Sequence, residues 1–202
     1  TSIMESMRYC DSWLEFLKKQ KPKKTQSDPC SSSVSVLVIH SKFIGNVSEQ
    51  EFSRCCQILA ANYRLEITLK AHPRSEKEIE SVLEKCPDIL RSEKELYELV
   101  HENDFVVFFQ SSGVLDALVA GIPVLFPSYA TSNVLKREIL EQCNIARSPD
   151  EFYNIVRMIS EEEQLKVPKF KRRDSRDLAL AWVKFLLEVG DQTSTIERRS
   201  AS

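Results

Sequence analysis

The chain has 202 residues, with 28 Lys and Arg residues against 30 Asp and Glu residues and a net charge of −2. This balance, with 42% hydrophobic residues, is typical of a globular protein and gives no general electrostatic attraction to nucleic acid or to an anionic membrane. The four glycines stand at positions 45, 113, 121 and 190. Neither G-x-G-x-x-G nor G-x-x-x-x-G-K can be written with them, which excludes dehydrogenases with that dinucleotide fingerprint and P-loop phosphotransferases.

The cysteines and the amino end bear on metal content and location. The six cysteines, at positions 10, 30, 55, 56, 86 and 143, form no C-x-x-C pair. The sequence therefore predicts neither a zinc site nor a disulfide framework, and we expect no bound metal. The amino end is charged and amphipathic rather than a signal sequence, and the longest apolar runs are too short to cross a bilayer. We expect a cytoplasmic protein, with peripheral attachment to the membrane as the alternative.

The predicted elements alternate along the chain. Residues 3–17 place apolar side chains at helical spacing, and residues 18–33, rich in Lys, Ser and Pro, are typical of a linker. The expected strands span residues 34–39, 65–69, 105–109, 123–126 and 144–147, and the expected helices span residues 49–61, 76–85, 93–101, 112–120, 132–142 and 150–160. Residues 174–189 predict a long amphipathic helix that needs a partner surface.

Three details of this pattern make sharper predictions. Ser92 and Glu95 have the spacing of a capping box, which predicts that a helix opens at residue 93. Residues 105–109 form the most apolar strand, which we expect at the centre of the sheet. Gly121 is expected to end the helix before it.

Alternating strands and helices imply right-handed crossovers in a parallel sheet. The sequence therefore predicts a doubly wound, Rossmann-like α/β domain over residues 34–163. Residues 1–33 are expected to form a flanking amphipathic helix and a linker. Residues 164–189 are expected to form a connection and a long crossing helix, and residues 190–202 a disordered tail.

Ligands of open parallel sheets bind outside the carboxyl ends of the strands, so the loops at those ends are the candidate site. The loop after the first strand carries Lys42, and the loop after the second carries His72, Pro73 and Arg74. A histidine fixed by a following proline, with an arginine beside it, presents hydrogen-bond donors to a phosphate. The alternatives are a solvated lysine and a histidine that caps a neighbouring carbonyl group.

The loop after the central strand carries Ser111, Ser112 and Gly113, and Asp116 lies one turn further on. Two hydroxyl groups and a glycine at a helix start suit an anion, and a carboxylate there can accept hydrogen bonds from a ribose diol. The alternatives are that Ser112 is an N-cap and Asp116 a favourable acid of the first turn. Residues 128–132 follow the next strand, where they line the same crevice or cap the next helix.

The run ITLKAHPR, followed by DFVVFFQSSGVLDALVAGIPVLFPSYA, resembles the carboxyl-terminal, donor-binding half of GT-B glycosyltransferases and glycerophosphotransferases that build bacterial surface polysaccharides. In the polysialyltransferase, capsule Kdo-transferase and CDP-glycerol transferase branches, an HP pair and a double-serine loop hold the nucleotide. Here the HP pair is His72 with Pro73, the serines are Ser111 and Ser112, and the acidic residue after them is Asp116. The resemblance covers about residues 34–147.

The resemblance implies the nucleotide-donor-binding domain of a GT-B enzyme, with a nucleotide-sugar or CDP-polyol donor and a glycan acceptor as substrates and no cofactor. The implied nucleotide- and phosphate-binding residues are His72, Pro73, Arg74, Ser111, Ser112, Gly113, Asp116 and Lys42. A GT-B enzyme also has an amino-terminal half, so we expect a further domain or a partner chain to complete the site. The catalytic residues stay unassigned, since His40 and His101 are candidate bases by residue type alone.

Two other functions remain open at the level of sequence. A nucleotide-sugar epimerase has the same GT-B fold and a similar Ser/Gly loop. A non-catalytic module that binds a nucleotide or docks on a partner is the second alternative, and its contacts would come from the basic stretches at residues 18–24 and 169–173. None of these functional hypotheses predicts nucleic acid as a partner.

Overall fold

The computed structural model describes residues 33–41, 47–72, 76–111, 113–132 and 137–161. The predicted amino-terminal helix and linker, the crossing helix and the tail lie outside these residues. The predicted division of the chain into these flanking segments therefore stays a prediction.

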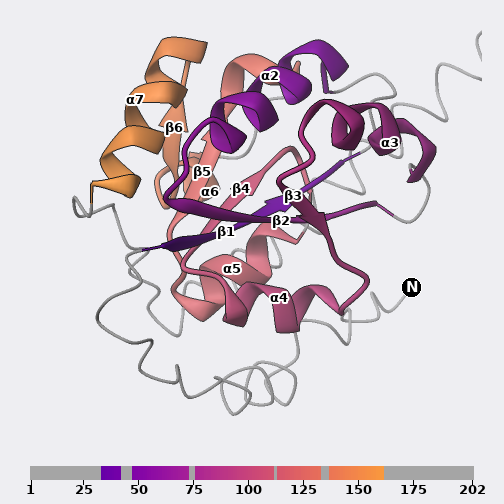
Figure 1. Ribbon diagram of the computed structural model, residues 1–202. Coiled ribbons are helices and arrows are strands. Elements are labelled where there is room, and N and C mark those ends of the chain that lie inside the picture. The colour runs from indigo at the N-terminus through magenta and orange to yellow at the C-terminus, as the bar shows by residue number, and fades with distance from the viewer. Residues whose placement is uncertain (1–32, 42–46, 73–75, 112, 133–136, 162–202) are drawn as a thin grey trace, which may run out of the picture.

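The described strands form one parallel sheet with the order β3-β2-β1-β4-β5-β6 (Figure 1). The strands are β1 (Val34–Ile39), β2 (Leu65–Lys70), β3 (Ile89–Arg91), β4 (Phe105–Phe108), β5 (Val124–Pro127) and β6 (Asn144–Ala146). The helices are α2 (Glu49–Ala60), α3 (Glu76–Lys85), α4 (Leu96–Glu102), α5 (Val114–Ala120), α6 (Arg137–Leu140) and α7 (Pro149–Ser160), with a 3-10 turn at Ser128–Ala130. This is the doubly wound, Rossmann-like fold that the alternation predicts, and β4 lies inside the sheet as expected.

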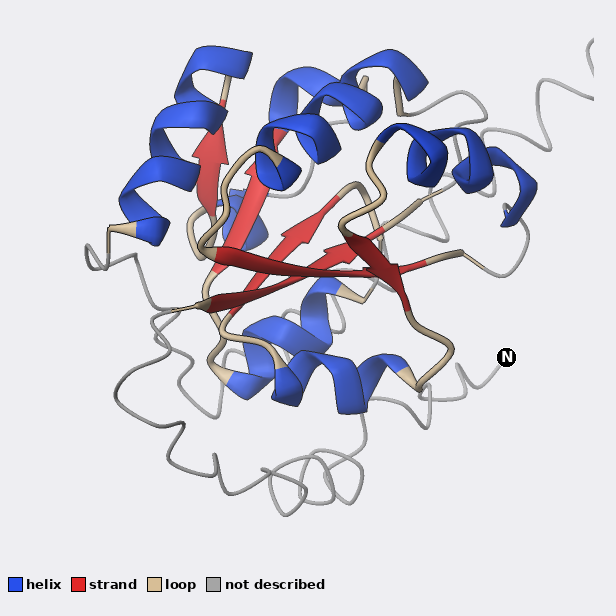
Figure 2. Cartoon of the chain, viewed as in Figure 1, coloured by secondary structure: helices blue, strands red, loops and turns tan. Residues whose placement is uncertain are grey.

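Helices cover both faces of the sheet (Figure 2). One apolar cluster joins the sheet to α2, α3 and α7, and a second joins it to α4, α5 and α6. Side chains of β1 alternate between the two clusters, with Val36 and Val38 in the first and Leu37 and Ile39 in the second. Because both faces are covered, the strands are continuous apolar runs in the sequence.

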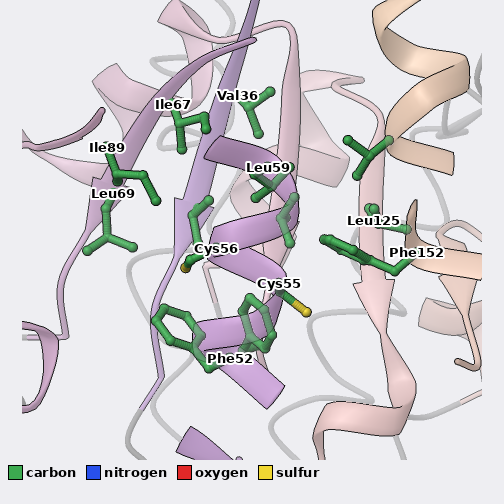
Figure 3. Close-up of a cluster of buried hydrophobic side chains, with 14 of the residues drawn as sticks. Val36, Phe52, Cys55, Cys56, Leu59, Ile67, Leu69, Ile89, Leu125 and Phe152 are labelled. Carbon is green, nitrogen blue, oxygen red and sulfur yellow. The ribbon is translucent and has the colours of Figure 1, made fainter. Parts of the chain in front are cut away.

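The first cluster fixes α2 and α7 on the sheet (Figure 3). Phe52 and Leu59 of α2 and Phe152 of α7 are fully buried there, together with the strand residues Val36 and Leu125. Each large side chain contributes roughly 2 kcal/mol by leaving water. The loop that follows β1 is therefore attached to a firmly packed helix.

Two helices begin at serine N-caps, and a third ends at the glycine that the sequence predicts. Ser48 and Ser148 are the N-caps of α2 and α7, and each hydroxyl accepts a hydrogen bond from a backbone N–H of the first turn, at 3.3 and 3.1 Å respectively. Gly121 ends α5 with φ 73°, a left-handed conformation that glycine adopts without strain.

Two predictions fail between α3 and α4. The edge strand β3 was not expected, because three residues are too few to show a strand pattern. The capping box at Ser92 does not form, since the Ser92 hydroxyl accepts from Lys94 N at 3.3 Å within a local turn. Helix α4 therefore begins at Leu96 rather than residue 93, and Glu95 takes the N-cap position without a side-chain cap bond.

Other boundaries move by one or two residues. Strand β5 lies one residue later than the expected 123–126, and α5 opens at Val114 instead of Ser112. The described part of α6 ends at Leu140, and Gln142 N then donates to Ile139 O at 3.0 Å in a turn. These shifts leave the strand order and the loops at the carboxyl edge unchanged.

Candidate functional site

The loops after β1, β2 and β4 meet at the carboxyl edge of the sheet. Strand β1 lies between β2 and β4, and the helices that follow β1 and β4 pack on opposite faces. His40 N donates to Lys70 O at 3.0 Å, and Phe109 N donates to Ile39 O at 3.3 Å. These two bonds keep the carboxyl ends of β1, β2 and β4 next to one another. Ser41 Oγ donates to Gln110 O at 3.4 Å and joins the first loop to the third. This is the topological switch point where ligands of this fold class bind.

His40 lies directly after β1 and is 1% exposed. Its ring packs edge to face on Phe52, with ring centroids 5.0 Å apart. Burial, and to a smaller extent the charge of nearby His72, lower the pKa of His40 from 6.5 to about 4. His40 is therefore neutral at pH 7.

The loop after β4 has an unusual backbone. Gln110 has φ 53°, which is uncommon for a residue with a side chain and marks a sharp change of direction. Ser111 Oγ accepts a hydrogen bond from Gly113 N at 3.2 Å and closes the turn that follows. A strained residue in a loop at a switch point is a frequent feature of functional sites.

Gly113 is closely packed against α4. A Cβ there would overlap Leu96 Cδ2, whereas Ile39 Cδ1 of β1 would lie in ordinary contact at 3.6 Å. The absence of a side chain therefore lets the loop lie against the Leu96 side chain. Gly113 takes the N-cap position of α5 in an αR conformation and makes no side-chain cap bond.

Asp116 lies in the first turn of α5 and is 4% exposed. The burial agrees with an interaction inside the fold, and its predicted contact with a ribose diol stays a prediction. Helix α5 has only seven residues, so its dipole is a small contribution to anion binding at this edge.

The loop after β5 is joined by hydrogen bonds to α2, to the N-cap of α2 and to β6. Tyr129 Oη and Cys55 Sγ are hydrogen bonded at 3.0 Å, and Ser128 Oγ donates to Ala146 O at 3.0 Å. Burial raises the pKa of Cys55 to about 12 and raises that of Tyr129 as well. Ser48 N also donates to Ala130 O at 2.9 Å. These side chains hold the loops in place, which is a structural role that the sequence did not indicate.

The structure describes four of the predicted site residues, His72 after β2 and Ser111, Gly113 and Asp116 after β4. The other four, Lys42, Pro73, Arg74 and Ser112, lie outside the described residues. His40 also lies at this edge, where its backbone N–H donates to Lys70 O of β2. Its residue type alone did not indicate this position. Its position immediately after an apolar strand was the signal available in the sequence.

In the part of the chain that the structure describes, no three His, Cys, Asp or Glu side chains gather in a way that could hold a metal ion. None of the helices described there is long and apolar enough to cross a membrane.

No family model matches the chain, and no curated protein matches it in sequence. Solved structures do match it in fold. A candidate UDP-N-acetylglucosamine 2-epimerase from Listeria monocytogenes aligns with TM-score 0.57 and 15% identity over 87% of this chain and 52% of its own. UDP-GlcNAc 2-epimerase from Neisseria meningitidis, bound to UDP-GlcNAc, aligns with TM-score 0.54 and 14% identity over 84% of this chain and 49% of its own. UDP-GlcNAc 2-epimerase from Methanocaldococcus jannaschii aligns with TM-score 0.52 and 14% identity over 76% of this chain and 46% of its own.

The chain therefore spans about half the length of these structures. At this identity the likeness shows the fold, which is that of a Rossmann-like half of a GT-B protein. The fold expected from the sequence resemblance is confirmed. The roles of its short motifs are not tested by the likeness.

Proposed function

We propose that the chain is the nucleotide-donor-binding domain of a GT-B glycosyltransferase or glycerophosphate transferase of surface glycan synthesis. The observation that carries the proposal is the meeting of three loops at the switch point, with His40, His72 and the Ser111–Gly113 turn on neighbouring strand ends. The GT-B-like fold supports it, because nucleotide sugars bind proteins of this fold, including the Neisseria epimerase that holds UDP-GlcNAc.

The phosphate groups of the donor would lie among the predicted donors of this edge. His72 offers an imidazole N–H, and Lys42 and Arg74 offer cationic groups in the same two loops. Transfer breaks the bond between the donor group and the nucleotide phosphate, so negative charge grows on the leaving phosphate. Positioned cations and N–H donors lower the barrier by stabilising that charge.

The rest of the nucleotide would lie along the loop after β4. Ser111 and Ser112 would donate to the phosphates or the base. Asp116 would accept from the ribose diol. The acceptor glycan and the catalytic base would come from a further domain or a partner chain, in keeping with the half-length match to the solved structures.

Epimerisation of a nucleotide sugar is the second candidate. It is favoured by the names of three of the matching structures, which are UDP-GlcNAc 2-epimerases, one of them a candidate. Both functions need a nucleotide-sugar site at the same edge, and they differ in the fate of the sugar. A cytidine nucleotide favours the transferases of the CDP-polyol type, whereas a uridine nucleotide agrees with a glycosyltransferase and with an epimerase.

Isothermal titration of the 202-residue chain with UDP-GlcNAc, UDP, CMP, CDP, GDP and inorganic phosphate tests the proposal. We expect one nucleotide to bind, and His72→Ala and Ser111→Ala to weaken it at least tenfold, since each removes a donor to a charged group. His101→Ala, in α4 and outside the three loops, is the matched control and should bind normally. A folded chain that binds none of the nucleotides, or binds equally well after both substitutions, would contradict the proposal.

A further inference from the structure

A second hollow lies at the opposite edge of the domain, away from the proposed nucleotide site. Its volume is about 370 Å³, and it opens between the carboxyl-terminal ends of α2 and α7, which lie side by side in Figure 1. Ile58 and Val156 are the apolar residues at its base, and Tyr63 and Tyr153 stand on its rim. We call it the α2–α7 hollow.

The rim is unusually aromatic and exposed. Tyr63 is 89% exposed and Tyr153 is 56% exposed, and they are two of the three exposed large hydrophobic side chains in the described residues. Arg64 packs beside the Tyr63 ring, with its guanidinium carbon 5.9 Å from the ring centroid, and donates from Nη1 to Ser160 O at 3.1 Å. Tyr and Arg on a fixed rim are the residue types that dominate binding energy in protein interfaces.

The charges of the hollow are of both signs. Tyr153, Arg157 and Glu161 follow one another at intervals of four residues, so they form one stripe along α7. Arg157 and Glu161 are exposed, and in the part of the chain that the structure describes no ion pair holds either of them. A surface that carries an unpaired cation and an unpaired anion on one stripe can pair with a copy of itself.

We propose that the α2–α7 hollow is the contact surface between two copies of this chain related by a two-fold axis. Antiparallel apposition of the two α7 helices sets Arg157 of each copy against the partner's Glu161. The Tyr63 side chain of each copy then enters the hollow of the other, where it buries its ring on Ile58 and Val156. The opposite edge, with the nucleotide site, stays open in both copies.

Sedimentation equilibrium of the 202-residue chain across a wide concentration range measures the association directly. We expect a reversible dimer. Arg157→Glu and Glu161→Arg should each raise the dissociation constant at least tenfold, because a two-fold interface contains each substitution twice and puts like charges together. The double variant Arg157→Glu/Glu161→Arg should return to within about threefold of the original value, since the pair is restored with its signs exchanged.

Leu90→Glu is the matched control. Leu90 is 68% exposed on the edge strand β3, outside the hollow, so the change alters an exposed apolar residue without touching the surface in question. We expect it to leave the dimer intact. A chain that is monomeric at every concentration, a dimer that the Leu90 variant breaks, or a double variant as weak as the single ones would each overturn the proposal. Normal circular dichroism of every variant excludes unfolding as the cause.

Discussion

Ser35 and Asp104 exchange four hydrogen bonds across the amino ends of β1 and β4. Ser35 Oγ and Ser35 N donate to Asp104 Oδ2 at 2.8 and 3.2 Å, and Asp104 N donates to Ser35 O at 2.9 Å and approaches Ser35 Oγ at 3.1 Å. These bonds set the register in which Val36 pairs with Phe105. The register in turn fixes where both strands end, and so where His40 and Phe109 lie at the candidate site.

Removing this contact should lower stability. Asp104→Ala leaves two donors of Ser35 without their carboxylate, at a cost of about 1 to 3 kcal/mol. The expected result is a lower urea midpoint with an unchanged slope. Glu102→Ala is the control, because its carboxylate only pairs with exposed Lys94 and should contribute close to nothing. Equal midpoints for the two variants would show that the contact does not hold the register.

The buried His40 should make the fold sensitive to acid. Its pKa falls from 6.5 in the unfolded chain to about 4 in the folded one, so the unfolded chain takes up the proton first as the pH falls. The stability is therefore complete above about pH 6.5 and declines toward pH 4, by about 3 kcal/mol in total.

The measurement is the free energy of unfolding in urea at several pH values between 4 and 7.5. His40→Gln cannot take up the proton, so its decline over this range should be shallower than that of the unsubstituted chain. His101→Gln should keep the full decline. If the free energy of unfolding falls with pH equally in the His40 variant and in the unsubstituted chain, His40 is not the group that causes the decline.

The Cys55–Tyr129 hydrogen bond should stabilise the contact between α2 and the loop after β5. Tyr129→Phe removes the hydroxyl and leaves a buried thiol without it, at a cost of about 1 kcal/mol in the free energy of unfolding. Tyr97→Phe is the control, because its hydroxyl donates to the exposed carboxylate of Glu98 and lies away from Cys55 and the loop after β5. Thermal unfolding followed by circular dichroism separates the two, and a Tyr97 variant as unstable as the Tyr129 variant would rule out the bond as the cause.

Gly113→Ala should both destabilise the fold and weaken nucleotide binding. The new methyl group overlaps Leu96 Cδ2, which is the end of a flexible and partly buried side chain, so the overpacking costs about 1 kcal/mol, the low end for such changes. Leu96→Ala in the same chain frees the space, so the double variant should be more stable than the sum of the two single changes predicts. Additive losses in urea unfolding would show that the two side chains do not compete for this space.

Much of the fold follows from the sequence because local patterns and global packing agree. The apolar run of β4 lies inside the sheet, and Gly121 ends α5 with positive φ, as predicted. Prediction from the sequence is wrong where the local structure depends on only a few residues. Ser92 has the spacing of a cap, yet it closes a turn, and β3 is too short to show a period.

The site is harder to predict than the fold. His72 and Ser111 could be chosen from the sequence because each follows a strand. The burial of His40 and the electrostatic influence of His72 on it depend on the pairing of β1 with β2, which no local pattern shows. The Tyr129–Cys55 bond joins residues 74 positions apart and is invisible for the same reason.

The most direct measurement of the central claim is nuclear magnetic resonance of the 15N-labelled chain during titration with the nucleotide that binds best. The account predicts that the amide signals of His40, His72, Ser111 and Gly113 shift together and saturate with one dissociation constant, while Tyr63 and Tyr153 at the opposite edge stay in place. If the amide signals of residues that line the α2–α7 hollow shift while those at the carboxyl edge of the sheet stay unchanged, the proposed nucleotide site is contradicted.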